Sequence, residues 1–310
     1  MPPREGQRPN QPFIASPDEL ASFRPLTPEE TARVKGEPKT GKRERTREGQ
    51  ITVEQAETIL GPDCHGPEAV EQTFGIKIPE AEVPAIPFTA ADLERAKALG
   101  QMLVLRADTA PDGQPLTMKK MDELLRDRFA KEKKGKVLYN TDWYKYESFF
   151  TEQPPKLRWA LVSKDTIPNS TSQNYLEQTQ TLADYLTNDV FNGKAMPKEY
   201  AEAIAEFNAQ KAEIEKTMET DWQKAAEMLA NLQITELTRP TPAEILYDIL
   251  IHFQTTGERL LEKIYAWSRR RSSVGKLVYV GVSDADGVIV DGWHPDGSSD
   301  DIGAPFSRSR

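Results

Sequence analysis

The clearest periodic pattern along the chain begins at Thr241. Apolar residues then recur at the three- and four-residue spacing of a helix, at Ile245, Ile249, Phe253, Leu260, Ile264 and Trp267. Thr241 can cap the free amides, Pro242 suits the first turn, and Glu244 completes a capping box. The pattern predicts a helix from 241 to 267 that ends in the basic residues 269–271, which favour the negative end of the helix dipole.

Short apolar runs elsewhere predict four strands, at 101–106, 157–162, 277–282 and 288–290. Helical spacing between them predicts helices at 53–59, 69–74, 89–99, 117–129, 174–191 and 197–232. We therefore predict an α+β fold, with the strands in one small mixed or antiparallel sheet and the two longest helices packed beside it. The helix at 197–232 also has a heavily charged face, so it is a candidate for contact with a second copy of the chain.

Composition divides the chain into three parts. Residues 1–50 are rich in Pro, Gly, Arg and Glu and almost free of apolar periodicity, which predicts a disordered arm. Residues 51–99 form a helical lead-in, and residues 100–310 form the domain that carries the function. The hydrophobic fraction of 37% agrees with a core in only part of the chain.

Charge and cysteine content exclude several classes of function. The formal net charge of -9 argues against general nucleic-acid binding, which needs Lys and Arg gathered on one face. The single cysteine, Cys64, excludes an internal disulfide. No stretch has the length and hydrophobicity of a membrane span or a signal peptide, so we expect a cytoplasmic protein that does not enter a membrane.

Most of the isolated chemical motifs have a structural interpretation. Residues 36–42 have the glycine and lysine spacing of a phosphate-binding loop, but Arg43 stands where Ser or Thr would hold magnesium. Cys64 and His65 are adjacent but have no further metal-ligating residues near them in sequence. An aromatic run follows at Trp143, Tyr144, Tyr146, Phe149 and Phe150; we interpret it as part of the core rather than a base-stacking surface. The sequence therefore predicts no cofactor.

The segment 280–291 is similar to the first motif of haloacid-dehalogenase-type phosphatases. That resemblance implies a magnesium-dependent phosphatase in which Asp284 attacks phosphorus and Asp286 protonates the leaving group. In that family the motif ends the first strand of a doubly wound fold, yet only 24 residues follow Asp286 here and none of them is Lys. Calcium binding by the same aspartates lacks the glycine and terminal glutamate of a calcium-binding loop.

A second resemblance covers residues 100–310. Residues 239–244 (Arg-Pro-Thr-Pro-Ala-Glu) and 301–308 (Asp-Ile-Gly-Ala-Pro-Phe-Ser-Arg) are similar to two phrases of C-type-lectin-like domains of the formylglycine-generating-enzyme branch. The resemblance implies that the first phrase opens a helix and that the second closes the domain. The paired active-site cysteines of the enzyme are absent, which leaves the ligand-binding use of that fold.

Within that branch, the C-terminal segment 272–310 resembles the variable proteins of diversity-generating retroelements, found in phages and bacteria. In those proteins, rewriting at adenines turns Asn-type codons into codons for Ser, Asp, Gly, His, Tyr or Arg, and this segment is rich in such residues. The resemblance implies a non-catalytic display protein that binds an unknown protein or small ligand. The candidate binding residues are Tyr279, Ser283, Asp284, Asp286, Asp291, Trp293, His294, Asp296, Ser298, Ser299, Asp300 and Asp301.

Strand geometry predicts how such a segment divides. Alternate residues face opposite sides, so an inward row can stay fixed while its neighbours change. We expect Leu277, Val280, Val282, Ile289, Ile302 and Phe306 to point inward. Trp293 is the expected anchor of the binding surface, and closure of the core is its alternative role. An undiversified interaction module and the phosphatase remain the competing functions.

Overall fold

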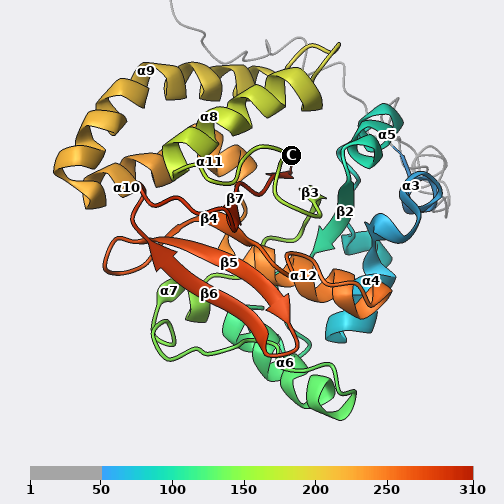
Figure 1. Ribbon diagram of the computed structural model, residues 1–310. Coiled ribbons are helices and arrows are strands. Elements are labelled where there is room, and N and C mark those ends of the chain that lie inside the picture. The colour runs from blue at the N-terminus through green and yellow to red at the C-terminus, as the bar shows by residue number, and fades with distance from the viewer. Residues whose placement is uncertain (1–50, 310) are drawn as a thin grey trace, which may run out of the picture. The chain divides into compact units, whose positions relative to one another are not determined.

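The computed structural model describes residues 51–309, in which helices and small sheets are mixed along the chain. This confirms the α+β class. The arm predicted at residues 1–50 lies outside the described residues. Figure 1 shows the order of the elements in space.

The lead-in forms three helices, α3 (Val53–Leu60), α4 (Pro67–Phe74) and α5 (Ala90–Ala98). Thr52 and Thr89 open the first and third of them with complete capping boxes. Between α3 and α4, the two-residue strand β1 (Cys64–His65) pairs in parallel with strand β2. The lead-in thus contributes a strand to the first sheet.

The first sheet has the strand order β1-β2-β3-β8. Strand β2 (Gln101–Arg106) is buried throughout and lies antiparallel to β3 (Arg158–Ser163). The C-terminal strand β8 (Ser307–Arg308) pairs with the other side of β3. Both central strands were predicted from their apolar runs, to within one residue at each end.

The second sheet has the order β6-β5-β4-β7. It consists of β4 (Tyr265–Arg271), β5 (Leu277–Asp284), β6 (Gly287–Trp293) and β7 (Ile302–Gly303). The prediction of a single sheet was therefore wrong. The missing partner was β4, because its residues had been assigned to the end of a long helix.

That helix, α12 (Pro242–Thr256), ends eleven residues before Trp267, and Gly257 is its C-cap. Gly257 has a left-handed φ of 80°, which glycine adopts at low cost, and its N–H donates to the Phe253 carbonyl. The predicted start was right, since the Thr241 and Glu244 capping box is present. Figure 1 shows α12 behind β5 and β6, and its buried side chains share one core with both sheets.

The helix predicted at 197–232 is broken. It forms α9 (Lys198–Thr220) and α10 (Trp222–Asn231), followed by α11 (Gln233–Thr238). The break lies at Asp221, whose extended φ of -151° leaves the helical region and whose side chain accepts from the Lys224 N–H as a new N-cap. In Figure 1, α10 turns back under α9.

Helix α8 (Tyr175–Tyr185) and the π-helical turn Leu186–Val190 confirm the helix predicted at 174–191. Together with α9–α11, they form a second core over Trp267 and Leu277. Helix α6 (Met118–Lys131) and the short α7 (Ser148–Thr151) lie on the other face of the second sheet, the face that also packs against α12. The second sheet therefore has helices over one face and over only part of the other.

Candidate ligand-binding face

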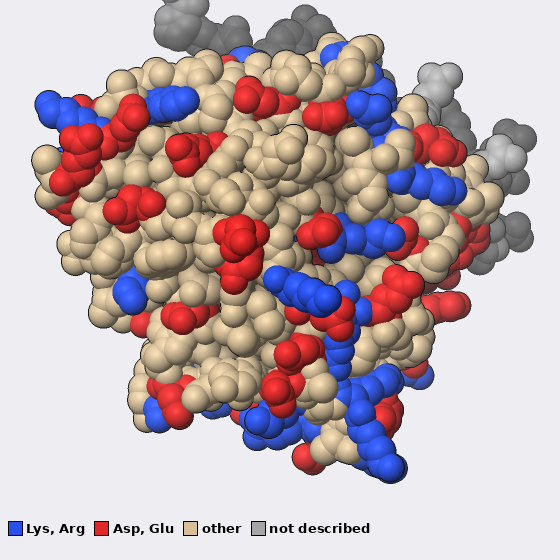
Figure 2. All heavy atoms as spheres, in the orientation of Figure 1, with Lys and Arg blue, Asp and Glu red and all other residues tan. Residues whose placement is uncertain are grey.

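The face of the second sheet that turns away from α12 is the outer face. On β6, Val288 and Val290 are buried, whereas Ile289, Asp291 and Trp293 alternate with them and are half-buried or exposed. The strand thus has one apolar side fixed in the core and one side open. Figure 2 shows this side of the molecule, where an otherwise uncharged surface carries both acidic and basic groups.

The pairing register continues the outer face across the sheet. Tyr279 of β5 lies opposite Asp291 on one side and Trp267 of β4 on the other. Tyr265 of β4 lies beside Tyr279, with their ring centroids 5.0 Å apart in an edge-to-face arrangement. Both tyrosines are half-buried, so their rings form the floor of the face.

The two tyrosines sit in an acidic environment. Burial, together with the negative charges of Asp291 and Asp301, raises the pKa of Tyr279 above its ordinary value. Burial and the charges of Asp301, Asp291 and Asp284 raise the pKa of Tyr265 in the same way. Both phenols therefore keep their protons at neutral pH and can donate hydrogen bonds to a ligand.

The loop after β6 is held by its main chain. The carbonyl of Pro295 accepts from the Tyr175 N–H at 3.1 Å, and the carbonyl of Ser299 accepts from the Ser172 N–H at 2.8 Å. The ring of His294 stacks on Trp222 of α10, with centroids 4.1 Å apart. Because backbone groups carry most of these contacts, most side chains of the loop are free to differ.

Gly297 fits closely under the indole of Trp293. A Cβ at Gly297 would lie 2.6 Å from Trp293 Cδ2, which is closer than real side chains approach. Trp293 is 38% exposed, so one part of the ring packs on the loop and the rest meets solvent. The indole is therefore a partly exposed anchor at the end of β6.

The structure brings part of the predicted set together. Tyr279, Asp291, Trp293 and Asp301 border the outer face, and the Ser299 hydroxyl donates to the Asp301 carboxylate. Asp284 and Asp286 lie apart from them, at the turn between β5 and β6. Asp296, Ser298 and Asp300 are on the loop after β6, where they are exposed.

Ser283 does not belong to the binding surface, because it is 1% exposed. The prediction failed because Val282 has a left-handed φ of 45° and the β5–β6 register shifts between Gly281 and Asp284. This irregularity reverses the alternation, so that Ser283 turns inward and Val282 stays half-buried. Ile289, also predicted to point inward, is half-buried and belongs to the outer row of β6. The other predicted inward residues, Leu277, Val280, Ile302 and Phe306, are buried.

Sequence reasoning missed two parts of this surface. Tyr265 was missed because its segment was assigned to a helix, although Tyr265 and Trp267 show the alternation of a strand. In the aromatic run, Tyr144, Phe149 and Phe150 are buried as expected, but Trp143 and Tyr146 are 42% and 88% exposed. Their polar neighbours, Asp142 and Lys145, were the available signal.

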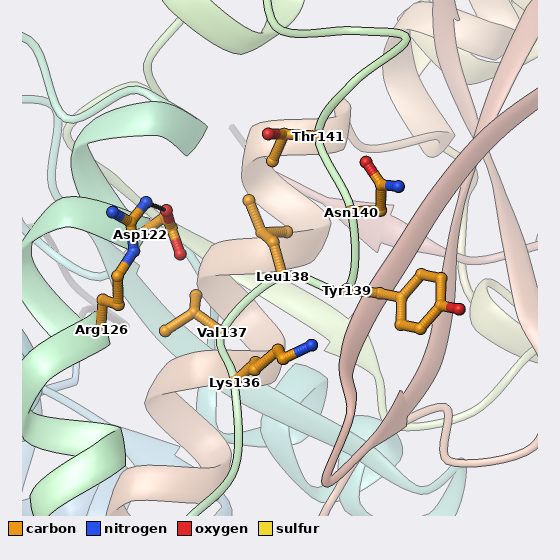
Figure 3. Close-up of a pocket in the computed structure, with 8 residues that line it drawn as sticks. All are labelled: Asp122, Arg126, Lys136, Val137, Leu138, Tyr139, Asn140 and Thr141. Carbon is orange, nitrogen blue, oxygen red and sulfur yellow. Dashed lines mark hydrogen bonds and ion pairs between the residues drawn. The ribbon is translucent and has the colours of Figure 1, made fainter.

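A separate cavity of about 560 Å³ lies between α6 and the segment 136–141 (Figure 3). Asp122 and Arg126 of α6 form an ion pair on one side of it. Burial raises the pKa of Asp122, against the lowering effect of Arg126. Its walls carry both charges, and no predicted site residue lines it.

The histidines do not form a catalytic group with the predicted surface. His65 and His252 instead meet inside the protein, with Nε2 of the first 3.0 Å from Nδ1 of the second. Across residues 51–309, no three His, Cys, Asp or Glu side chains are placed to hold a metal ion. The Asp286 N–H donates to the Asp284 carboxylate at 2.8 Å, within a tight turn of an antiparallel hairpin.

Comparison with protein-family models, with curated proteins and with solved structures finds no match to this chain. In the described part of the chain, no helix is both long and apolar enough to cross a membrane.

Proposed function

We propose that this chain is a non-catalytic ligand-binding protein whose segment 272–310 presents a variable binding surface. The surface consists of the outer face of β4, β5 and β6 and of the loop that follows β6. The proposal keeps the resemblance to C-type-lectin-like variable proteins of diversity-generating retroelements. Its ligand is an unknown protein or small molecule.

The observation that supports the proposal most directly is the alternation of buried and outward-facing residues along β6. Val288 and Val290 pack in the core while the residues between and after them face outward. A change at Asp291 or Trp293 therefore removes no core contact of the valines, and the fold tolerates it. A segment whose residues are rewritten needs this separation between the residues that form the core and the residues that contact the ligand.

The loop after β6 supports the same function. Its exposed side chains are Asp296, Ser298, Asp300 and Asp301, and its conformation is fixed by main-chain hydrogen bonds from Ser172 and Tyr175. Ser and Asp are among the residues that adenine rewriting produces from Asn-type codons. The loop thus combines a fixed backbone with replaceable side chains.

The phosphatase remains the alternative function, and its residues have an unfavourable setting for it. Asp284 ends β5, which pairs antiparallel with β6, whereas the phosphatase motif ends a strand of a parallel sheet. A phosphatase assay with magnesium separates the two functions. Activity in the parent that is lost in Asp284→Asn would establish the enzyme and contradict display as the main function.

The DNA beside the gene provides the decisive test of diversification. We expect a reverse transcriptase and a near-copy of codons 272–310 that differs from them at adenines. If neither is present, the chain is an undiversified interaction module. Contact between copies through the helices at 197–232 is a further part of the proposal, and light scattering of the purified protein measures it.

A further inference from the structure

Three of the exposed large hydrophobic residues, Tyr139, Trp143 and Trp293, lie on or beside β6. The residues of this kind that the structure exposes are Tyr139, Trp143, Tyr146, Val274 and Trp293. Four of these five are aromatic. Only Val274 and Trp293 belong to the segment 272–310, so the other three residues are a part of the surface that rewriting would leave unchanged.

Tyr139 extends the outer face beyond β6. Leu138 forms a parallel bridge with Val288, and the Tyr139 N–H donates to the Val288 carbonyl at 3.0 Å. Leu138 is buried with Val288 in the core, so the next residue, Tyr139, points to the other side, next to Ile289. Figure 3 shows Tyr139 projecting away from Leu138, toward the strands. Its ring is 52% exposed.

Trp143 lies on the same edge, where its ring also packs against Tyr144 and Phe149 of the core. The Trp143 indole N–H donates to the Val290 carbonyl at 2.9 Å. Glu147 accepts from the Ser273 N–H at 2.8 Å and from its hydroxyl at 2.6 Å, which places Tyr146 beside the turn between β4 and β5. We name Tyr139, Trp143 and Tyr146 the aromatic rim.

The segment 277–306, which supplies β5, β6 and the loop after β6, has one sign of charge. Residues 277–306 contain six aspartates and no Lys, Arg or Glu. These aspartates are Asp284, Asp286, Asp291, Asp296, Asp300 and Asp301. Other acidic residues, such as Glu244, form ion pairs with arginines, but these six have no such partner in the part of the chain described. Asp284 and Asp286 lie apart at the turn between β5 and β6, where the charge of Asp284 acts on Arg259. Asp291, Asp296, Asp300 and Asp301 are therefore the charges available to a ligand at the outer face and its loop.

The rim itself is suited to cations. Lys136 Nζ lies 5.9 Å from the centroid of the Tyr139 ring, and Lys145 Nζ lies 5.5 Å from that of Tyr146. Both distances are within the range in which a ring face attracts a positive charge. The same ring faces can attract Arg or Lys side chains of a partner protein.

We propose that the outer face and the aromatic rim together bind a cationic segment of another protein. Arg or Lys side chains of the partner lie over the rim rings and pair with the unpaired aspartates. The inference rests on the proposed function, and it adds the charge class of the partner that this version of the segment selects: the aromatic rim is constant, whereas the aspartates belong to the variable segment. A nucleic acid would be repelled by the aspartates, and a second copy of this face carries the same charge.

The test uses the full chain and two synthetic peptides, one of alternating arginine and serine and the other with glutamate in place of arginine. Calorimetry should detect binding of the arginine peptide only, and the affinity should fall as salt is raised. In Tyr139→Ala/Tyr146→Ala, the affinity should drop about tenfold, whereas Tyr139→Phe/Tyr146→Phe keeps it because the ring faces remain.

Variants that remove negative charges distinguish binding at the outer face from attraction by the net negative charge of the whole protein. Asp291→Asn/Asp301→Asn should lower the affinity for the arginine peptide about fivefold. The control Glu199→Gln/Glu215→Gln removes the same charge from exposed positions of α9 and should change the affinity by less than about twofold. Lys136→Gln/Lys145→Gln should strengthen binding, because it frees both rings and removes repulsion.

Three results would overturn the inference. The first is equal binding of the two peptides, the second is equal loss in the Ala and Phe variants, and the third is an equal effect of the α9 control. A library selection on the full chain distinguishes this failure from failure of the proposed function. Ligands without positive charge that bind the outer face would leave display standing and contradict the cationic partner.

Discussion

Glu244 Oε1 lies 3.2 Å from Arg106 Nη1, although the two residues belong to α12 and β2. The same carboxylate caps α12, accepting from the Thr241 N–H at 2.8 Å, and meets Arg158 at 2.9 Å. Burial would raise the pKa of Glu244, but the charges of Arg106, Arg269 and Arg158 outweigh it and lower the pKa to about 2. One side chain therefore joins the helix cap to both central strands of the first sheet.

Replacement of Glu244 should destabilise the whole described unit. Glu244→Gln keeps the shape and the cap but removes one of the two buried carboxylates that face Arg106, the other being Asp248, so we expect a loss of about 3–5 kcal/mol in the free energy of unfolding. Denaturant unfolding measures it. As control, Glu199→Gln on the exposed side of α9 should cost less than about 0.5 kcal/mol. A loss below about 1 kcal/mol in Glu244→Gln would contradict a structural role for the ion pairs.

Acid should weaken the protein through the His65 and His252 pair. One ring donates and the other accepts across 3.0 Å, so only one hydrogen fits between them. Burial and the neighbouring His252 lower the pKa of His65 to about 4, and burial lowers the pKa of His252. Asp63, Lys164 and Glu258 are the charged groups near them.

Both rings are thus neutral in the folded protein, whereas the unfolded chain binds protons below its ordinary pKa of 6.5. The contribution of the pair to stability should be constant above that pH and fall between about pH 6.5 and 4, by roughly 3 kcal/mol for His65. Asp248 contributes in the opposite direction over this range, because burial raises its pKa to about 6. His65→Gln/His252→Gln should remove this slope but keep the later loss below about pH 4.5 that comes from Glu244. An unchanged slope in the double variant would exclude the histidines as its source.

Substitutions at two neighbouring residues of β6 should have very different effects on stability. Val290→Ala removes a buried side chain and should cost about 2 kcal/mol, whereas Asp291→Ala should change stability by less than about 0.5 kcal/mol. Thermal melting compares the pair. Replacement of Asp284, Asp286, Asp291, His294, Asp296, Ser298 and Asp300 together by Ala should also lower the melting temperature only slightly. A large loss in Asp291→Ala would mean that the outer row holds the fold and is unsuited to variation.

Gly281 should not tolerate a side chain. Its Cβ would lie 2.1 Å from the Ile264 carbonyl oxygen, a backbone atom that cannot move aside without separating β4 from β5. Gly281→Ala should therefore cost more than about 3 kcal/mol. The control Gly257→Ala meets no atom within 4 Å and has only its left-handed φ of 80° as a penalty, about 1 kcal/mol. Equal losses in the two variants would contradict close packing at Gly281.

The parts of the fold that were predictable are those with strong local signals. The capping box at Thr241 and Glu244 and the apolar run of β2 each specify their element without distant contacts. The end of α12 was missed because apolar residues continue past Gly257 at a spacing that a helix also fits. Tertiary pairing with β5 decides that Tyr265 and Trp267 belong to a strand.

The candidate site was predictable to the extent that strand alternation holds. Asp291 and Trp293 face outward as expected, but the left-handed residue Val282 reverses the pattern, and no sequence signal marks it. The contribution of Tyr139 depends on a bridge between residues far apart in the chain. Local sequence patterns do not predict such contacts between segments that are far apart in the chain.

The short strand β8 makes folding depend on the last residues of the chain that the structure describes. Ser307 and Arg308 complete the first sheet against β3, and the Arg106 guanidinium donates to the Ser307 hydroxyl at 3.1 Å. A chain that stops anywhere within 272–306 leaves the edge of β3 open and this buried guanidinium short of an acceptor. Misfolded fragments of that kind are removed by proteases. If the proposed rewriting takes place, a version that ends early would therefore be removed before it could display a surface.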